Sequence, residues 1–228
     1  MKVIILAGGF GTRIAQAAGP KPMVKIGGKP IIYHIMKYYE SYGFKEFVIA
    51  LGYKANLIKK ELKKYKFQIE FVDTGLNTMT GGRLKRLKRF IKNERFMLTY
   101  GDGLSNVNLN KLLKFHIKSK KLATVTAVHP PARFGEIIIK NSNVKEFNEK
   151  TTSKTQWING GFFVFEPEVL NFIDNDSTPL EGKPLSRLTK KKNLAAFRHE
   201  GFWQCMDTMK DKIFLENTWK KNPPWKIW

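Results

Sequence analysis

The 228-residue sequence has a single cysteine and no hydrophobic run long enough to cross a membrane. Cys205 alone can form no disulfide within the chain and no all-cysteine metal site. A membrane-spanning helix needs about 20 consecutive apolar residues. The first strand-like run already begins at residue 2, which leaves no space for a secretory signal. We therefore expect a cytoplasmic protein with no membrane partner.

Arginine is scarce although the chain is strongly basic. The formal net charge is +22, but only 8 of the 41 basic residues are arginine and 33 are lysine. Arginine reads base edges and clamps phosphates with two hydrogen bonds, whereas dispersed lysine mostly keeps a surface solvated. The charge therefore favours small anionic substrates, and we expect no nucleic-acid partner. A basic protein that binds nucleic acid or another anion without turnover is the alternative.

Strand-like and helical patterns alternate along the first 130 residues. Expected strands lie at about 2–7, 46–51, 68–73, 95–101 and 122–129, and expected helices at about 30–42, 54–65, 81–92 and 108–120. This alternation predicts an α/β domain with a mostly parallel central sheet flanked by helices. Further strands are expected at about 135–140, 143–148 and 157–165, and short helices near 167–174, 182–192 and 208–220.

The first strand runs into a glycine-rich turn that fits neither common nucleotide motif. Residues 6–13 read LAGGFGTR, which lacks the third glycine of the dinucleotide fingerprint, and no Walker motif occurs in the chain. Backbone N–H groups of such a turn can approach a polyphosphate closely, and Arg13 adds positive charge directly after it. Lys21, fixed between Pro20 and Pro22, has the rigid placement of a charge that stabilises a transition state.

Further motifs follow this turn along the whole chain. They are PKPM at 20–23, TMTGGRLKR at 78–86, YGDG at 100–103, NEK at 148–150, INGGFF at 158–163 and GFWQCMDT at 201–208. Together they resemble the sugar-1-phosphate nucleotidylyltransferases, and among these the cytidylyltransferases that act on glucose-1-phosphate. The resemblance implies a Rossmann-like nucleotidyltransferase fold in one domain, residues 1–228. A nucleotide-binding half would cover about 1–130, and a small appended β/α half for the sugar phosphate about 131–228.

The reaction that the resemblance implies is transfer of CMP from CTP to glucose-1-phosphate, which gives a CDP-sugar for surface polysaccharide and pyrophosphate. Another sugar-1-phosphate, or another phosphorylated metabolite, stays open as the acceptor, and a homo-oligomer stays open as the assembly. A phosphate monoester has a second pKa near about 6, so the attacking oxygen is largely ionised at neutral pH and needs no general base. The obstacle is repulsion between two polyanions, which positive charge relieves.

The resemblance also assigns roles to residues. It implies catalytic roles for Arg13 and Lys21, which would contact the triphosphate, and a Mg²⁺ ion held by Asp102 and Asp207. The residues implied to bind the nucleotide are Gly8, Gly9, Gly11, Thr12, Arg13, Thr80 and Gly81. Those implied to hold the sugar phosphate are Gly135, Glu149, Lys150 and Asn159.

Overall fold

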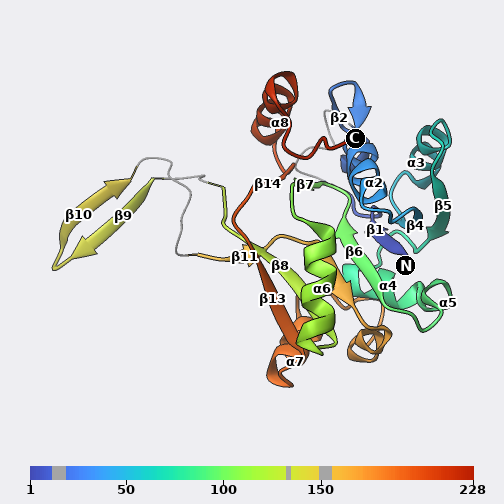
Figure 1. Ribbon diagram of the computed structural model, residues 1–228. Helices are drawn as coiled ribbons and strands as arrows, with labels where there is room; N and C mark the ends of the chain where they lie inside the picture. The colour runs from blue at the N-terminus through green and yellow to red at the C-terminus, as the bar shows by residue number, and fades with distance from the viewer. Residues whose placement is uncertain (12–18, 132–134, 149–155) are drawn as a thin grey trace.

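The computed structural model describes residues 1–11, 19–131, 135–148 and 156–228, and its centre is a mixed sheet (Figure 1). The strands of this sheet are β1 (Val3–Leu6), β4 (Glu46–Leu51), β5 (Gln68–Asp73), β6 (Phe96–Tyr100), β8 (Ala123–Val128), β11 (Ile158–Asn159), β12 (Phe163–Phe165) and β13 (Leu194–His199). The order runs β8-β12-β6-β1-β4-β5, and β11 and β13 also pair with β8. The strands β6, β1, β4 and β5 are parallel, whereas β12 is antiparallel to both neighbours.

Helices cover both faces of the sheet because its strands are apolar on both sides. The helices are α2 (Ile31–Ser41), α3 (Ala55–Leu62), α4 (Thr80–Arg86), α5 (Lys88–Ile91), α6 (Leu109–Ser119), α7 (Lys183–Lys190) and α8 (Met209–Lys221). Val3 and Ile5 of β1 share one core with residues of α2, α3, α6 and α8. Ile4 and Leu6 share the other core with α4, α5 and α7. A continuous apolar run such as β1 is typical of a parallel strand that is buried on both faces.

The α/β class, the mostly parallel sheet and the elements expected in the first 130 residues, apart from the helix at 81–92, are confirmed. The helix expected at 81–92 is instead two helices, because the chain turns at Leu87 between α4 and α5. The strand expected at 157–165 is broken into β11 and β12. At this break Gly161 and Phe162 have φ angles of 75° and 45°, which no strand residue adopts. The division into two halves stays a prediction.

Short elements complete the chain. These are β2 (Lys25–Ile26), β3 (Lys29–Pro30), β7 (Gly103–Ser105), β14 (Trp203–Cys205) and the 3₁₀ helices η1 (Lys21–Met23) and η2 (Pro167–Phe172). The antiparallel pair β14 and β7 is important for the site, because it brings the chain after Trp203 next to the chain after β6. None of the helices within the described ranges is long and apolar enough to span a membrane.

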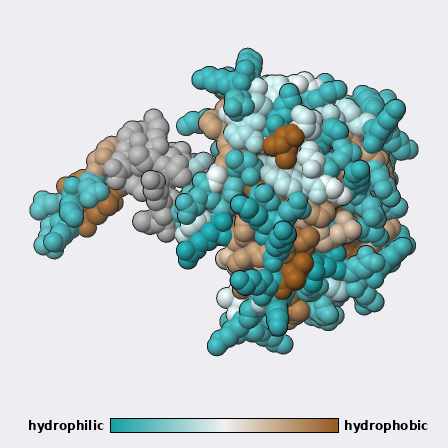
Figure 2. Space-filling model, in the orientation of Figure 1, coloured by the Kyte–Doolittle hydropathy of each residue, from teal (hydrophilic) through white to brown (hydrophobic). Residues whose placement is uncertain are grey.

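A hairpin of β9 (Glu136–Lys140) and β10 (Asn143–Asn148) projects away from the body of the molecule (Figure 1). The turn lies between the two strands expected at 135–140 and 143–148, with φ of 48° at Asn141 and 63° at Ser142. Apolar side chains on it are exposed, among them Ile139 at 68% and Phe147 at 63%, and they form brown patches on the hairpin in Figure 2. The hairpin therefore contributes little to the two cores.

Candidate active site

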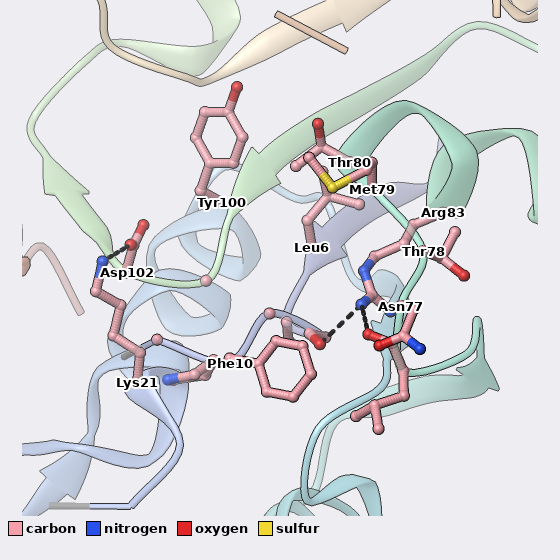
Figure 3. A pocket seen from close by; sticks show the side chains of 17 residues that line it. Leu6, Phe10, Lys21, Asn77, Thr78, Met79, Thr80, Arg83, Tyr100 and Asp102 are labelled. Carbon is pink, nitrogen blue, oxygen red and sulfur yellow. Dashed lines mark hydrogen bonds and ion pairs between the residues drawn. The ribbon is translucent and has the colours of Figure 1, made fainter. Parts of the chain in front are cut away.

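The glycine turn opens into a pocket at the carboxyl ends of β1 and β6, with a volume of about 390 Å³. Ligands of α/β proteins bind at this end of parallel strands. The lining residues are Leu6, Ala7, Gly8, Gly9, Phe10, Gly11, Lys21, Pro22, Leu76, Asn77, Thr78, Met79, Thr80, Arg83, Tyr100, Gly101 and Asp102. Figure 3 shows Lys21 and Asp102 on one side of the pocket and Arg83 on the other. The fold therefore brings the glycine turn, the first half of α4 and the YGDG motif to one cavity.

Three glycines of the turn line this pocket for different reasons. Gly8 is packed from behind, since a Cβ there would lie 2.2 Å from Nη1 of Arg83. Gly11 has a φ of 61°, which favours glycine, and a Cβ there would lie 3.1 Å from Cβ of Lys21. At Gly9 a Cβ would meet no atom within 4 Å. The backbone at Gly9 is therefore open to a ligand, while Gly8 and Gly11 shape the turn.

Lys21 meets two aspartates that are far away in the sequence. Its Nζ donates to Oδ2 of Asp102 at 2.7 Å and to Oδ1 of Asp207. These partners are 81 and 186 residues away from Lys21, and the backbone N–H of Met206 donates to the carbonyl oxygen of Asp102 at 2.9 Å. The structure thus brings the expected catalytic lysine and both expected metal ligands together.

Burial and the carboxylates act on the charges of this cluster in opposite directions. Burial alone would lower the pKa of the Lys21 ammonium, but Asp102 and Asp207 raise it above its usual value. Burial raises the pKa of Asp102, against the opposing effect of the Lys21 charge. Lys21 therefore stays charged at neutral pH, and the two carboxylates face one cation.

The two carboxylates also fit a divalent metal ion. Mg²⁺ is bound by one or two carboxylates together with phosphate oxygens and water, and Asp102 and Asp207 already approach a single positive centre, Nζ of Lys21. In the described part of the chain no group of three or more His, Cys, Asp or Glu side chains gathers as a metal site. The protein would thus supply two ligands, and the substrate the others.

Asp211, which the sequence reasoning did not include, fixes the backbone that carries Asp207. Its Oδ2 accepts from the backbone N–H groups of Asp207 at 3.1 Å and Thr208 at 2.8 Å, and the hydroxyl of Thr208 accepts from the N–H of Asp211. This is a capping box at the start of α8. The sequence signal was present as a threonine followed three residues later by an acid, directly after the GFWQCMD run.

Arg83 is a second residue that the sequence reasoning left out of the site. It is 4% exposed and donates to the carbonyl oxygens of Gly8 at 2.9 Å and Leu76 at 3.2 Å, both drawn in Figure 3. It also donates to the carbonyl oxygens of Leu51 and Gly75 and to Oγ1 of Thr74. Arg83 therefore ties the glycine turn to the opposite wall of the pocket. Nothing in the sequence of α4 distinguishes the buried Arg83 from its exposed basic neighbours Lys85 and Arg86.

Thr80 and Gly81 are placed differently from each other. Thr80 lines the pocket, and its hydroxyl donates to Oε2 of Glu181 at 2.7 Å and accepts from the N–H of Leu180 at 2.8 Å. Gly81 is buried and is not among the lining residues, and a Cβ there would lie 2.6 Å from the carbonyl oxygen of Thr178. Gly81 therefore permits a close approach of the segment around Thr178.

The residues expected to hold the sugar phosphate are only partly brought to the site. Nδ2 of Asn159 donates to Oη of Tyr100, a pocket residue, at 3.2 Å. Gly135 is exposed, directly precedes the hairpin and does not line the pocket. The remaining expected residues, Thr12, Arg13, Glu149 and Lys150, lie outside the described residues.

Comparison with known proteins agrees with the motifs and the fold. The profile of the family described as "Nucleotidyl transferase" matches residues 2–217. The chain belongs to this family and is therefore a nucleotidyltransferase, as its sequence predicts. It is 44% identical to glucose-1-phosphate cytidylyltransferase of Salmonella typhimurium over 256 aligned positions, which cover 100% of both chains. It is 39% identical to the probable glucose-1-phosphate cytidylyltransferase of Bacillus subtilis, again over 100% of both chains.

A solved structure shares the architecture. HddC from Yersinia pseudotuberculosis, complexed with GMP-PN, superimposes with a TM-score of 0.75 at 26% sequence identity. The match covers 95% of this chain and 98% of that chain. The Rossmann-like nucleotidyltransferase fold is therefore confirmed.

Proposed function

We propose that the chain transfers CMP from CTP to glucose-1-phosphate, with a CDP-sugar and pyrophosphate as products. The full-length similarity to glucose-1-phosphate cytidylyltransferases, at 44% identity, is the observation that carries this proposal. A phosphate oxygen of the sugar-1-phosphate forms a bond to the α-phosphorus of CTP. The bond from that phosphorus to the oxygen bridging the α- and β-phosphates breaks, and the electron pair leaves with pyrophosphate.

In this proposal the glycine turn binds the triphosphate. Gly8, Gly9 and Gly11 would present their backbone to the phosphates, with Gly9 as the most open position. The base would lie toward the wall formed by Leu76 to Thr80, which closes the other side of the pocket. Gly81 would contribute indirectly, because it lets the segment around Thr178 pack against α4.

Lys21 would stabilise the charge that develops on the phosphates. Its Nζ is held at the carboxyl end of β6 by Asp102 and Asp207, so the charge needs little reorganisation during the reaction. A bound Mg²⁺ ion would be held by Asp102 and Asp207 and would neutralise charge on the phosphates. Arg13 and Thr12 at the turn, and Glu149 and Lys150 at the sugar phosphate, stay predictions from the motifs.

The direct test is a screen for pyrophosphate release. Purified protein with Mg²⁺ is incubated with each of CTP, UTP, GTP, ATP and dTTP, crossed with the 1-phosphates of glucose, galactose and mannose. We expect the highest kcat/KM with CTP and glucose-1-phosphate, and loss of activity when EDTA removes the metal. No release with any pair would contradict the proposed function, and another preferred pair would correct the base or the acceptor.

A second screen separates the proposal from binding of nucleic acid. Binding that depends on phosphate contacts weakens steeply as salt rises. We expect no tight complex with DNA or RNA at physiological ionic strength in a filter-binding series. A tight complex there, together with absence of turnover, would support the alternative of an anion-binding protein.

A further inference from the structure

Glu181 links two hydroxyl groups that belong to different walls of the pocket. Its Oε2 accepts from the hydroxyl of Thr80 at the start of α4, and its Oε1 accepts from the hydroxyl of Tyr100 at the end of β6. In Figure 3 the hydroxyl oxygens of Tyr100 and Thr80 both point to the top of the view, away from Phe10 and Lys21. Glu181 itself is exposed and is no part of the pocket lining. It therefore lies at the rim, above the two walls.

The backbone that carries Glu181 is firmly attached to α4. The N–H of Met79 donates to the carbonyl oxygen of Asp176 at 2.8 Å, and the N–H of Gly82 donates to that of Thr178 at 3.1 Å. The N–H of Leu180 donates to Oγ1 of Thr80. A Cβ at Gly82 would lie 2.3 Å from the carbonyl oxygen of Asp176, so this close packing requires glycine. The carboxylate of Glu181 is thus presented from a fixed position.

Tyr100 connects Glu181 to a residue expected at the sugar phosphate. Its ring lines the pocket and packs edge-on against Phe163, with 6.0 Å between the ring centres. Its Oη accepts from Nδ2 of Asn159 at 3.2 Å while it donates its proton to Glu181. Oδ1 of Asn159 in turn accepts from the N–H of Gly161 at 2.9 Å, which fixes the orientation of the amide.

This chain of contacts determines what the Tyr100 oxygen can offer to a ligand. A phenol has one proton to donate and two lone pairs that accept. The proton is directed to Glu181 and one lone pair to Asn159, so the other lone pair remains as an acceptor. Burial raises the pKa of Tyr100, and the negative charge of Glu181 raises it further, so the phenol keeps its proton.

We propose that Glu181 is a positioning residue for the acceptor, which holds the Tyr100 hydroxyl so that its oxygen accepts a hydrogen bond from a hydroxyl group of the sugar-1-phosphate. The proposal rests on the proposed function, because it names the part of the acceptor that this site reads. The chemical class is a phosphorylated polyol whose hydroxyl points at Tyr100. A phosphorylated metabolite with no hydroxyl in that place would gain nothing from this contact.

The first variant is Glu181→Gln, which keeps the size of the side chain but replaces one acceptor oxygen by an amide donor. We expect the KM for glucose-1-phosphate to rise about tenfold, the loss typical of one hydrogen bond between neutral groups. The kcat at saturating substrates should stay within about threefold, and the thermal stabilisation by CTP with Mg²⁺ should match the wild type. Glu168→Gln, which removes an exposed carboxylate on η2, is the matched control and should leave every value unchanged.

The second variant, Tyr100→Phe, tests whether Glu181 acts through the tyrosine. Alone it should raise the KM for glucose-1-phosphate by about the same factor as Glu181→Gln, and the double variant should be no worse than either single one. If the increase in KM of the double variant were the product of the two single increases, the proposal would be overturned, because Glu181 would then not act through Tyr100. An unchanged KM in Glu181→Gln would overturn it as well.

The result remains separate from the test of the proposed function. If the wild type releases pyrophosphate with CTP and a sugar-1-phosphate, the function holds whatever the variants do. If the preferred acceptor proves to be another sugar-1-phosphate, the same KM measurements are made with that acceptor. A fall in CTP stabilisation in Glu181→Gln, with the acceptor KM unchanged, would assign Glu181 to the nucleotide instead and overturn the proposal.

Discussion

The two sides of the pocket each hold a basic side chain, but the surroundings of these side chains differ. Lys21 donates to two carboxylates, Asp102 and Asp207. Arg83 donates to four backbone carbonyl oxygens and one threonine hydroxyl, among them the carbonyl oxygen of Gly8. The two carboxylates that balance the charge of Lys21 could bind a metal ion in its place, and Lys21 could then pair with a phosphate. The guanidinium of Arg83 instead donates hydrogen bonds to the backbone that forms the pocket.

The partners of a basic residue therefore indicate whether it acts in the chemistry or in the fold. A cation that pairs with carboxylates can take part in chemistry, because the carboxylates can take up a metal ion and the cation a phosphate without loss of the fold. A buried guanidinium that satisfies several carbonyl oxygens is part of the frame, since its removal leaves each of them without a donor. Replacement of Lys21 should therefore lower turnover, whereas replacement of Arg83 should lower the stability of the fold.

The largest effect is expected for Lys21→Ala. Turnover should fall by about a thousandfold or more, because preorganised positive charge at the transferring phosphate is lost. The free energy of unfolding should change little, since Asp102 and Asp207 can be neutralised by a metal ion or solvent. Pyrophosphate release and urea denaturation in the presence of Mg²⁺ measure the two quantities.

The matched control for this variant is Lys25→Ala, which removes an exposed lysine of β2. It should keep both turnover and stability. Near-normal turnover in Lys21→Ala would remove Lys21 from the catalytic group and erase the contrast with Arg83.

The next effect is expected for Arg83→Leu. The free energy of unfolding should fall by about 3 kcal/mol, because buried carbonyl oxygens of the turn and of the opposite wall lose their donor. Arg83→Lys should recover only part of this loss, since one ammonium cannot reach all of these acceptors. Urea denaturation monitored by tryptophan fluorescence gives the values.

Arg89→Leu is the control, because Arg89 is exposed on α5 and stacks on Phe90 at 4.7 Å from the ring centre. Its stability should lie within about 0.5 kcal/mol of the wild type. If Arg83→Leu were as stable as this control and inactive, Arg83 would belong to the chemistry and not to the frame.

The smallest effect is expected for buried histidines. Lys21 and Arg83 stay charged at neutral pH, whereas a histidine can lose its charge there. Burial lowers the pKa of His34 and of His116 below the usual value of about 6.5. Between pH 7 and 5 the unfolded chain therefore binds more protons than the folded chain, and stability falls as the pH falls. We expect a loss of about 1 kcal/mol for each of these histidines.

The variant His116→Gln isolates one of them. Nδ1 of His116 lies 2.8 Å from Oγ1 of Thr124 and Nε2 lies 3.2 Å from Glu166, and glutamine can keep polar contacts there without titrating. The difference in stability between pH 7 and 5, measured in urea, should shrink in this variant. An unchanged difference would place the acid sensitivity elsewhere, for example at His34. Asp102 is no candidate, because its raised pKa makes the folded chain more stable as the pH falls.

Much of the fold follows from local patterns. The apolar run from Val3 to Leu6 predicts the first strand, and the pattern of residues 108–120 predicts the helix α6. The strand β13 was missed because its sequence, Leu194 to His199, has small and polar residues that show no clear period, and it forms against β8 as an added parallel edge. Elements of this kind depend on a neighbour and not on their own propensity.

The site residues that belong to a motif with a known chemical role could be predicted from the sequence. Those whose role depends on the packing of distant segments could not. Lys21, Asp102 and Asp207 belong to the motifs PKPM, YGDG and GFWQCMDT, and the fold brings them together. Arg83 stands in an equally distinct motif, but only the burial of its side chain distinguishes it from Arg86, which is exposed and pairs with Asp176. Glu181 lies in no motif, and its link to Tyr100 spans 81 residues.

The family, the alternation of strands and helices, and the residue types that phosphate and metal chemistry require can all be predicted from the amino-acid order. These depend on local order along the chain, which the sequence displays directly. Folding sets which charges meet, which glycines are needed for close packing and which basic residue is buried. Such contacts join residues that are far apart in the chain, and their burial depends on every neighbouring element at once, so only the folded molecule reveals them.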